Sequence, residues 1–556
     1  MQNVDTLPTR RAESVARTWS LSYEQIAYIV LAALAFVLYF ASLDMTPLKK
    51  GESRAALAAY RYVHAEAPGE ALIAPSPTLF LAQTAAFNLL GHDEFAARVG
   101  TALAGMLLVL TPILFRRALG VERSLLMSIL LLGSPVVLVS ARGSSSAVWA
   151  ALLAALTLWA GWRWWAERRE RDAILLLIFC AGLIFLAEPG GILMALALVG
   201  ALLSALVTTP AADDEDDEEE PVNRLAPLGE RLRAFPWLLA GGVALFVTIA
   251  VATVFFFYPA GLTATGDLLA RFVDGFVARP ANTPAFFPLR VSLFYEPWFW
   301  LLAAACLVWS WRRLQMDFIG RFALAWLILG ALAAIIYNGA GAEHALWLTL
   351  PLVLLVSGLA QPIFAPYDVD EAPGWARWLT ALAVFALLAM ASIAFQGVAR
   401  SVARFGTIQL ITSQADTINL IVLLIALAFM LVGYFLVRSF WESDGVPLRG
   451  AAIGLVTFAC LTSLGAGWRT AVSGAGNPVD LWQRRAVSPN LNLLRASLLD
   501  LADRTTRGYT EMQLGVVTGG DPLIAWQVRD FNNALLAGDV ASVRGEPVIL
   551  IPAQAI

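Results

Sequence analysis

The chain repeats apolar runs of about twenty residues, and this feature limits its possible folds more than any other. A helix needs about 20 apolar residues to cross the roughly 30 Å of hydrocarbon in a bilayer. The 556 residues are 59% hydrophobic and 14% charged, whereas a soluble domain carries about 25% charged residues. The sequence therefore predicts an all-α, polytopic membrane protein.

The apolar runs predict thirteen transmembrane helices and one helix at the membrane interface. The interface helix is the shorter apolar stretch 76–91, which we expect to lie at the membrane surface or to dip into it. The polar segment 1–23 precedes an apolar run long enough to stay as an anchor, which argues against a cleaved signal peptide. The predicted spans are 24–43, 97–115, 123–141, 145–164, 173–187, 191–208, 236–258, 293–311, 320–338, 345–363, 377–396, 417–437 and 450–467.

Lysine and arginine residues in the short loops set the expected orientation. Cytoplasmic loops carry an excess of these residues, so we expect the N-terminus inside a bacterial plasma (inner) membrane. An odd number of spans then places the C-terminus outside. The cations assigned to the cytoplasmic side are Arg10, Arg11, Arg17, Arg116, Arg117, Arg123, Arg163, Arg168, Arg169, Arg171, Arg312, Arg313, Arg321 and Arg438.

Three segments on the outer side are longer than connections require, namely 44–96, 259–292 and the tail 468–556. The tail loses the long apolar runs. It alternates a helical piece (NLLRASLLDLADRT) with strand-like pieces (MQLGVVTG and EPVILIPA) and turn signals. We therefore expect a cytoplasmic segment 1–23, a membrane domain 24–467 and a small extracytoplasmic α/β domain 468–556.

A cluster of charge, KKGESRAALAAYRYVH, follows the first predicted span. If it is helical, Arg54 and Arg61 share a face because they are seven residues apart, and His64 lies three residues further on. Arginine binds phosphate oxygens through a planar fork of donors, and Glu52 could take a proton from an attacking hydroxyl. The alternative is a helix whose cations only touch lipid headgroups.

Further cations are expected on the outer side, against the general bias. Arg98 and Arg142 lie at or near span ends, where a charge is costly and marks a functional candidate; snorkelling to the interface is the alternative for each. All three histidines also fall on this side, which slightly favours a site there. The remaining outer candidates are His92, His344, Arg271, Arg279, Arg290, Arg400 and Arg404.

The order of these parts resembles the GT-C glycosyltransferases, which take a sugar from a polyprenyl-phosphate carrier. The nearest branches are the protein O-mannosyltransferases, the aminoarabinose transferases and the flippase-associated glycosyltransferases. The resemblance extends over nearly the whole chain. The stretches that carry it are GESR, APSPTLFLAQTAAFNLLGHDEFAARVGTALAG, GSPVVLVSARG, FYEPWFW, AEHALWLTLPLVLL and DPLIAWQVRDF.

The resemblance implies roles for two residues and shows one departure. Arg54 matches the arginine that contacts the carrier phosphate, and Glu52 matches the second acid of an Asp-Glu pair. The first acid, usually the catalytic base, falls on Gly51. A second acid of the family is also missing, because RGSSSAVW (142–149) offers only serines. Either Glu52 acts as the base or the chain keeps the scaffold without the chemistry.

The expected function is transfer of a sugar from a polyprenyl-phosphate donor to an acceptor outside the cytoplasm, with inversion at the anomeric carbon. The donor, an unidentified lipid, glycan or protein acceptor, and membrane lipids are the expected partners; no cofactor, metal or nucleic acid is expected. Two alternatives are an inactive relative that serves as a scaffold in an envelope complex and a lipid-linked-sugar transporter. Glu52 is the catalytic candidate, and the candidates for binding phosphate or substrate are Arg54, Arg61, His64, Arg98, Arg142, Arg279, Arg290 and His344.

Overall fold

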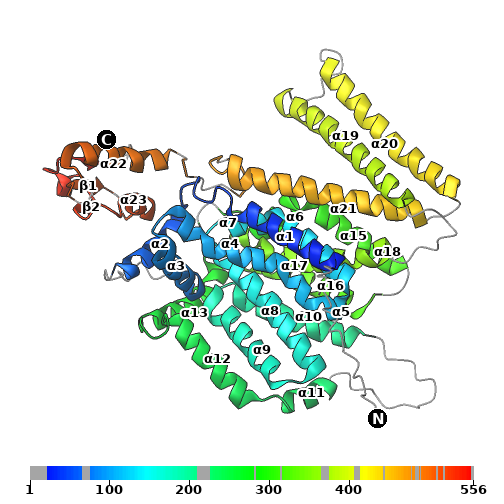
Figure 1. The fold of residues 1–556 in the computed structure, drawn as a ribbon, viewed down its shortest axis with the longest axis horizontal. Helices are drawn as coiled ribbons and strands as arrows, with labels where there is room; N and C mark the ends of the chain where they lie inside the picture. Colours follow the sequence, from blue (N-terminus) through cyan, green and yellow to red (C-terminus); the bar gives the residue numbers. More distant parts are fainter. Residues whose placement is uncertain are drawn as a thin grey trace, which may run out of the picture.

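A computed structural model describes the chain from residue 22 to residue 551, with gaps (Figure 1). The expected N-terminal segment 1–23 therefore lies almost entirely outside the described residues. The gaps are 65–75, 210–225, 281–282, 313–315, 365–374, 406–413, 442–444, 478, 483–486, 489, 509–510 and 518–519.

Nearly all of the regular structure is helical. The helices of the first half are α1 Tyr23–Phe40, α2 Lys50–Val63, α3 Pro77–Leu90, α4 Glu94–Leu110, α5 Arg116–Leu119, α6 Val121–Gly133, α7 Pro135–Arg142, α8 Ser146–Glu167, α9 Glu170–Gly182, α10 Gly191–Thr208, α11 Ala226–Arg233, α12 Trp237–Ala252 and α13 Gly261–Val277. Those of the second half are α14 Phe287–Tyr295, α15 Pro297–Arg312, α16 Phe318–Ile336, α17 Leu346–Val356, α18 Ala360–Phe364, α19 Ala376–Phe405, α20 Gln414–Trp441, α21 Gly445–Trp468, α22 Leu491–Thr506 and α23 Pro522–Gln527.

The predicted membrane architecture is confirmed, whereas the span count of thirteen stays a prediction. Every predicted span overlaps a helix. Within the described ranges, 8 helices are long and apolar enough to cross a bilayer, or up to 10 if each of two bent pairs is one span. Part of the difference comes from short helices such as α9, whose 13 residues extend about 20 Å at 1.5 Å per residue.

Two apolar helix pairs are bent at a residue that precedes a proline. α6 and α7 meet at 60° around Ser134, and α14 and α15 meet at 87° around Glu296. Proline removes a helical hydrogen bond and disfavours helical backbone before it. The two breaks are joined, because the Ser134 hydroxyl donates to Glu296 and Thr349 donates to the same carboxyl at 2.7 Å. This buried network holds both bends at one place in the core.

The α19–α20 hairpin projects away from the body of the protein (Figure 1). All residues of α17 are buried. In α20, by contrast, only 6% of the most apolar stretch is buried. A helix that is apolar all round and uncovered suits a lipid environment, so this hairpin is consistent with the predicted spans.

The tail folds as a small α/β unit, as the sequence predicts. Its parallel sheet has the order β2-β1-β3, formed by Ala534–Ala537, Leu514–Val517 and Ile549–Leu550. α22 packs on the sheet through Leu498 and Ala502. In Figure 1 this unit lies beside α2 and α3, at one end of the helical body.

Trp526 fastens the tail to the first outer segment. Its ring is fully buried among residues of α2 and α3, including Tyr60 and Phe87, and its Nε1 donates to Glu94 Oε1 at 3.0 Å. The Tyr60 hydroxyl donates to the carbonyl of Arg529 at 3.2 Å. The tail therefore holds the helix that carries the charged cluster.

Trp526→Ala is expected to loosen the tail from α2 and α3. Truncating a buried tryptophan costs roughly 3–5 kcal/mol, and here it also leaves Glu94 without its donor. Hydrogen exchange of the amides in α23 and α2 should rise, whereas Leu493→Ala, at a side chain 64% exposed, should leave it unchanged. Equal exchange in both variants would show that Trp526 does not fasten the tail.

Candidate functional site

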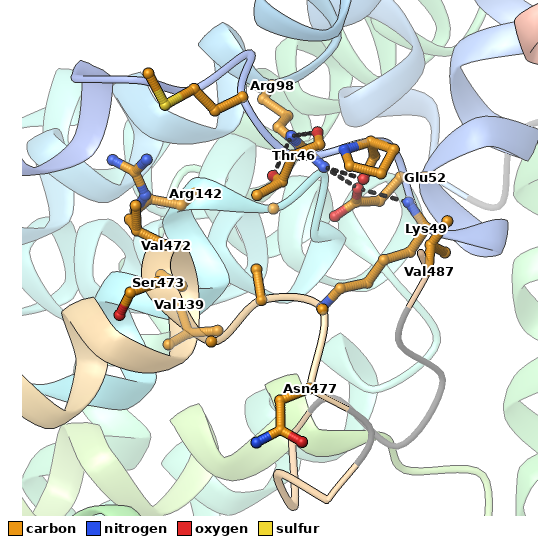
Figure 2. A pocket seen from close by; sticks show the side chains of 17 residues that line it. Thr46, Lys49, Glu52, Arg98, Val139, Arg142, Val472, Ser473, Asn477 and Val487 are labelled. Atoms are coloured by element: carbon orange, nitrogen blue, oxygen red, sulfur yellow. Dashed lines mark hydrogen bonds and ion pairs between the residues drawn. The ribbon is translucent and has the colours of Figure 1, made fainter. Parts of the chain in front are cut away.

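A cavity of about 470 Å³ lies between the segment after α1, the end of α7 and the loop after α21 (Figure 2). Its charged side chains are three cations and one carboxylate, so the cavity is electropositive. The lining residues are Met45, Thr46, Pro47, Lys49, Glu52, Arg98, Val139, Arg142, Gly143, Ala471, Val472, Ser473, Gly474, Ala475, Gly476, Asn477 and Val487.

Glu52 fixes the start of α2 at the edge of this cavity. It occupies the third position of the helix, and its Oε2 accepts the backbone N–H of Lys49 at 3.0 Å. An acidic residue in the first turn also suits the helix dipole. A side chain placed on Gly51 would meet nothing within 4 Å, so the position that the motif resemblance aligns with an acid faces open space.

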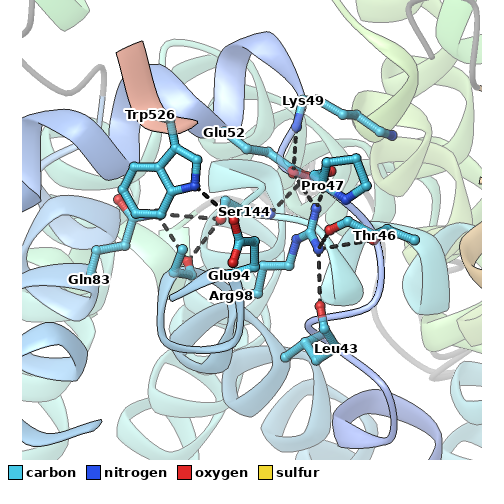
Figure 3. A network of polar contacts seen from close by, with 11 residues as sticks. Leu43, Thr46, Pro47, Lys49, Glu52, Gln83, Glu94, Arg98, Ser144 and Trp526 are labelled. Carbon is cyan, nitrogen blue, oxygen red and sulfur yellow. Dashed lines mark hydrogen bonds and ion pairs between the residues drawn. The ribbon is translucent and has the colours of Figure 1, made fainter. Parts of the chain in front are cut away.

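A buried ion pair joins α2 to α4 (Figure 3). Arg98 is 3% exposed, and its Nη2 lies 2.7 Å from Glu52 Oε2. The same guanidinium donates to the carbonyls of Leu43, Thr46 and Pro47 at 2.7–3.1 Å. Arg98 thus clamps the whole turn between α1 and α2 through its planar fork of donors.

The ion pair keeps Glu52 ionised. Burial alone would raise the pKa of Glu52, but the charges of Arg98 and Lys49 outweigh it and hold the pKa below its usual value. Glu52 Oε1 also accepts the backbone N–H of Ser144 at 3.3 Å. A carboxylate with a lowered pKa and three donors is a poor proton acceptor. The geometry therefore supports a positioning role for Glu52 more than the role of a base.

The ion pair gives a testable pH dependence. Since the pKa of Glu52 is lower in the folded protein, its stabilising contribution is complete above the ordinary value of 4.5 and is lost as the pH falls through the folded pKa. The difference in melting temperature between the wild type and Glu52→Gln should therefore be constant above about pH 5.5 and shrink below pH 4.5. A difference that grows on acidification would contradict this assignment.

Arg142 caps the C-terminal end of α1. Its Nη1 donates to the carbonyl of Leu38 at 2.7 Å and its Nη2 to that of Ala41 at 2.8 Å, and it lies over the Trp468 ring at 5.1 Å. The last carbonyls of a helix lack intrahelical partners and favour a nearby cation. Arg98 and Arg142 are thus committed largely to backbone, although the buried Nε of each has no partner among the described residues.

Lys49 differs from the two arginines of the cavity, because its charged group is not held by backbone carbonyls or by an ion pair with a described residue. It precedes α2 with extended backbone (φ −74°, ψ 165°), and its side chain runs across the cavity towards the loop that carries Asn477 (Figure 2). Its ammonium group forms no ion pair with a described residue. Burial lowers the pKa of Lys49, an effect that the charge of Glu52 opposes.

The other predicted site residues lie away from this cavity. Arg54 is exposed, because residues two apart on a helix are about 200° apart and Glu52 faces inward. Arg61 is half-buried in the last turn of α2. The exposed His64 caps that helix and stacks on Tyr60, 4.0 Å between ring centroids.

Two further predicted cations also stand apart. Arg279 is exposed and donates to Asn338 Oδ1 at 2.6 Å, and Arg290 is exposed on α14. The structure thus brings Glu52, Arg98 and Arg142 together with Lys49, and it places the other predicted residues elsewhere.

His344 forms a second buried cluster with Glu188, which the sequence analysis did not select. His344 Nε2 lies 3.6 Å from Glu188 Oε1, and Ser146 donates to Glu188 Oε2 at 3.2 Å. Burial raises the pKa of Glu188. The available signal was an acid in the short turn AEPGG between two apolar runs, where a charge is costly.

Comparisons with known proteins give the fold. No family model matches the chain, and no curated protein matches its sequence. The structure resembles ArnT from Cupriavidus metallidurans bound to undecaprenyl phosphate, with a TM-score of 0.54 and 16% identity over 94% of this chain and 89% of that one.

Two further solved structures are similar. The apo state of the same ArnT gives a TM-score of 0.53 and 16% identity, over 95% and 90% of the two chains. The Archaeoglobus fulgidus oligosaccharyltransferase gives 0.46 and 13% identity over 92% of this chain and 63% of that chain. The ArnT comparisons confirm the GT-C fold that the sequence motifs suggest.

Proposed function

We propose that this GT-C protein is a membrane glycosyltransferase that takes a sugar from a polyprenyl-phosphate donor. The observation that carries the proposal is the electropositive cavity with the uncommitted ammonium group of Lys49. A phosphate needs charge-assisted donors, and Lys49 offers three of them beside the positive fields of Arg98 and Arg142. The undecaprenyl phosphate bound to ArnT supports a lipid phosphate as the ligand.

The residues of the cavity suggest how such a transfer would proceed. An acceptor oxygen would form a bond to the anomeric carbon while the bond to the phosphate oxygen breaks and leaves its electron pair on the phosphate. Lys49 would stabilise this leaving group as its negative charge grows. Glu52 would hold the start of α2, and thereby Lys49, through its bonds to Arg98 and to the Lys49 backbone.

The proposed orientation has the cavity on the outer face of a bacterial plasma membrane with the N-terminus inside. It follows from the loop arginines, several of which lie together on one side of the protein. Arg116 pairs with Glu24 at the start of α1, and Arg123 pairs with Asp317 at the start of α16. The cavity lies beyond the opposite end of α1.

Turnover of a lipid-linked sugar tests the proposal. The purified protein in lipid nanodiscs should release polyprenyl phosphate from an undecaprenyl-phosphate sugar in the presence of acceptor lipids and glycans. Lys49→Met should abolish the release, and Lys50→Met, whose side chain is exposed and pairs with Asp521 at 3.8 Å, should not. Equal release by both variants would refute the role of the cavity.

One observation favours a second function, an inactive relative that binds the lipid as a scaffold. Among the described residues that line the cavity, the one carboxylate is Glu52, and it is committed to Arg98. Gly51 and the serines of 144–146 supply no further acid. This alternative predicts lipid binding that depends on Lys49, together with no turnover of any lipid-linked sugar.

A further inference from the structure

One wall of the cationic cavity comes from the loop after α21. Residues 471–477 form this wall, and Lys49 extends across the cavity towards it (Figure 2). The wall carries no charged side chain, so it gives the cavity shape rather than charge. Its position relative to Lys49 therefore decides how closely a phosphate beside the ammonium group is enclosed.

Asp480 joins the two ends of this wall. Thr470, the residue before the wall, donates its hydroxyl hydrogen to Asp480 Oδ2 at 3.3 Å. The backbone N–H of Asp480 donates to the carbonyl of Asn477, the last residue of the wall, at 3.2 Å. Asp480 itself does not line the cavity, so it can act on a ligand only through the wall and through its charge.

Tyr295 fastens Asp480 to the helical core. Its side chain is 5% exposed, and its hydroxyl donates to Asp480 Oδ1. The backbone N–H of Trp482 lies 3.0 Å from both the Tyr295 hydroxyl oxygen and Asp480 Oδ1, and the Tyr295 and Trp482 rings meet edge to face, 5.8 Å between centroids. Tyr295 is the last residue of α14 and belongs to the main hydrophobic core. The wall is therefore fastened to the packed body of the protein.

The charge of Asp480 also reaches Lys49. Burial lowers the pKa of Lys49, and nearby carboxylates oppose this effect. The charges that act on the ammonium group are those of Glu52, Arg98, Glu343 and Asp480. Asp480 thus favours the charged form of Lys49, although its own charge would repel a phosphate.

We infer that Asp480 is a positioning residue of the phosphate site, which ties the wall 471–477 to Tyr295 and holds it where it encloses a lipid phosphate beside Lys49. A ligand gains most from a site that is already formed, because ordering a loop on binding costs free energy. A second contribution is the negative charge that Asp480 places near Lys49. The inference rests on the proposed function, since it explains how that same cavity keeps its shape.

Three variants separate the hydrogen bond between Tyr295 and Asp480 from the charge of Asp480. Asp480→Asn keeps a side-chain oxygen that can accept from Tyr295 and removes the charge, whereas Asp480→Ala removes both. Tyr295→Phe removes the hydroxyl and keeps the charge and the ring that packs on Trp482. The ligand is undecaprenyl methyl phosphate in nanodiscs, because a phosphodiester keeps one negative charge across the pH range measured.

Binding at pH 6 tests the hydrogen bond. Asp480→Ala and Tyr295→Phe should each raise the Kd about 3- to 10-fold, the worth of one hydrogen bond that holds the competent form of the site. Asp480→Asn should bind at least as tightly as the wild type. Removal of a nearby negative charge by itself should tighten binding of an anion, so weaker binding by Asp480→Ala indicates a displaced wall. Tyr23→Phe, at a side chain 94% exposed, is the matched control.

Binding at higher pH tests the charge. Since Lys49 holds the anion as an ammonium group, affinity falls as the pH rises through the pKa of Lys49. Both Asp480 variants lose a carboxylate that opposes the lowering of this pKa, so their affinity should fall at a lower pH than that of the wild type. Tyr295→Phe keeps the carboxylate and should match the wild-type midpoint. A merely structural role of Asp480 would not move this midpoint.

The outcomes separate this inference from the proposed function. Lys49→Ala should weaken binding, and an unchanged Kd in that variant would overturn the proposed function. If Lys49→Ala weakens binding while Tyr295→Phe binds like the wild type at pH 6, the inference is overturned, whether or not Asp480→Ala folds. It is also overturned if Asp480→Asn loses as much affinity as Asp480→Ala at pH 6, because the hydrogen bond to Tyr295 should survive that change.

Discussion

Arg98→Gln is expected to cause a large loss of stability, because this arginine joins α4 to the start of α2. The change removes the partner of a buried carboxylate, which costs roughly 3–5 kcal/mol. It also removes the hydrogen bonds that hold the backbone of the turn between α1 and α2. The melting temperature of the purified protein in detergent should fall by several degrees, and hydrogen exchange of residues 43–52 should rise.

A double-mutant cycle isolates the ion pair from the backbone contacts. Glu52→Gln combined with Arg98→Gln should be less destabilising than the sum of the two single changes, because no buried charge is left unpaired. Arg54→Gln is the matched control, since this arginine is exposed on the same helix and should change the melting temperature little. Strict additivity of the two single changes would contradict the buried pair.

Lys49→Ala is expected to cause the largest loss of lipid-phosphate affinity. A hydrogen bond to a charged group is worth about 1.5–3 kcal/mol, so the dissociation constant for undecaprenyl phosphate should rise roughly 10- to 100-fold. Native mass spectrometry or a scintillation assay with labelled undecaprenyl phosphate measures this change.

Lys50→Ala serves as the control because it removes an equal charge at the next position. The Lys50 ammonium faces Asp521 of the tail rather than the cavity, so affinity should change less than about 3-fold. Similar losses in both variants would mean that general attraction to an anionic lipid, rather than the cavity, accounts for binding.

Much of the fold could be predicted from the sequence because span length and loop charge are local properties. Every predicted span overlaps a helix, and the α/β tail was predicted from its change of pattern. β2 was missed, since its sequence ALLA lacks β-branched or aromatic residues and its pairing with β1 depends on distant residues. The residue at which short helices such as α9 end was not predictable from apolar run length alone.

The site could be predicted only in part. Arg98 and Arg142 could be selected from the sequence because a charge near the membrane is costly. Their hydrogen-bond partners could not, since these are backbone carbonyls more than 50 residues away, such as those of Thr46 and Leu38. The orientation of the cluster depends on where α2 begins, because each residue turns a helix by about 100°. Its first residue is Lys50, so Glu52 faces the cavity, Arg54 faces outward and Lys49 stays extended.

A structure of the protein determined with undecaprenyl phosphate in nanodiscs tests the central claim most directly. The account predicts the phosphate inside the cavity, within about 3 Å of Lys49 Nζ, with the Glu52–Arg98 pair intact behind it. A phosphate bound instead at Arg54, Arg279 or Arg290, with the cavity left empty, would contradict the account.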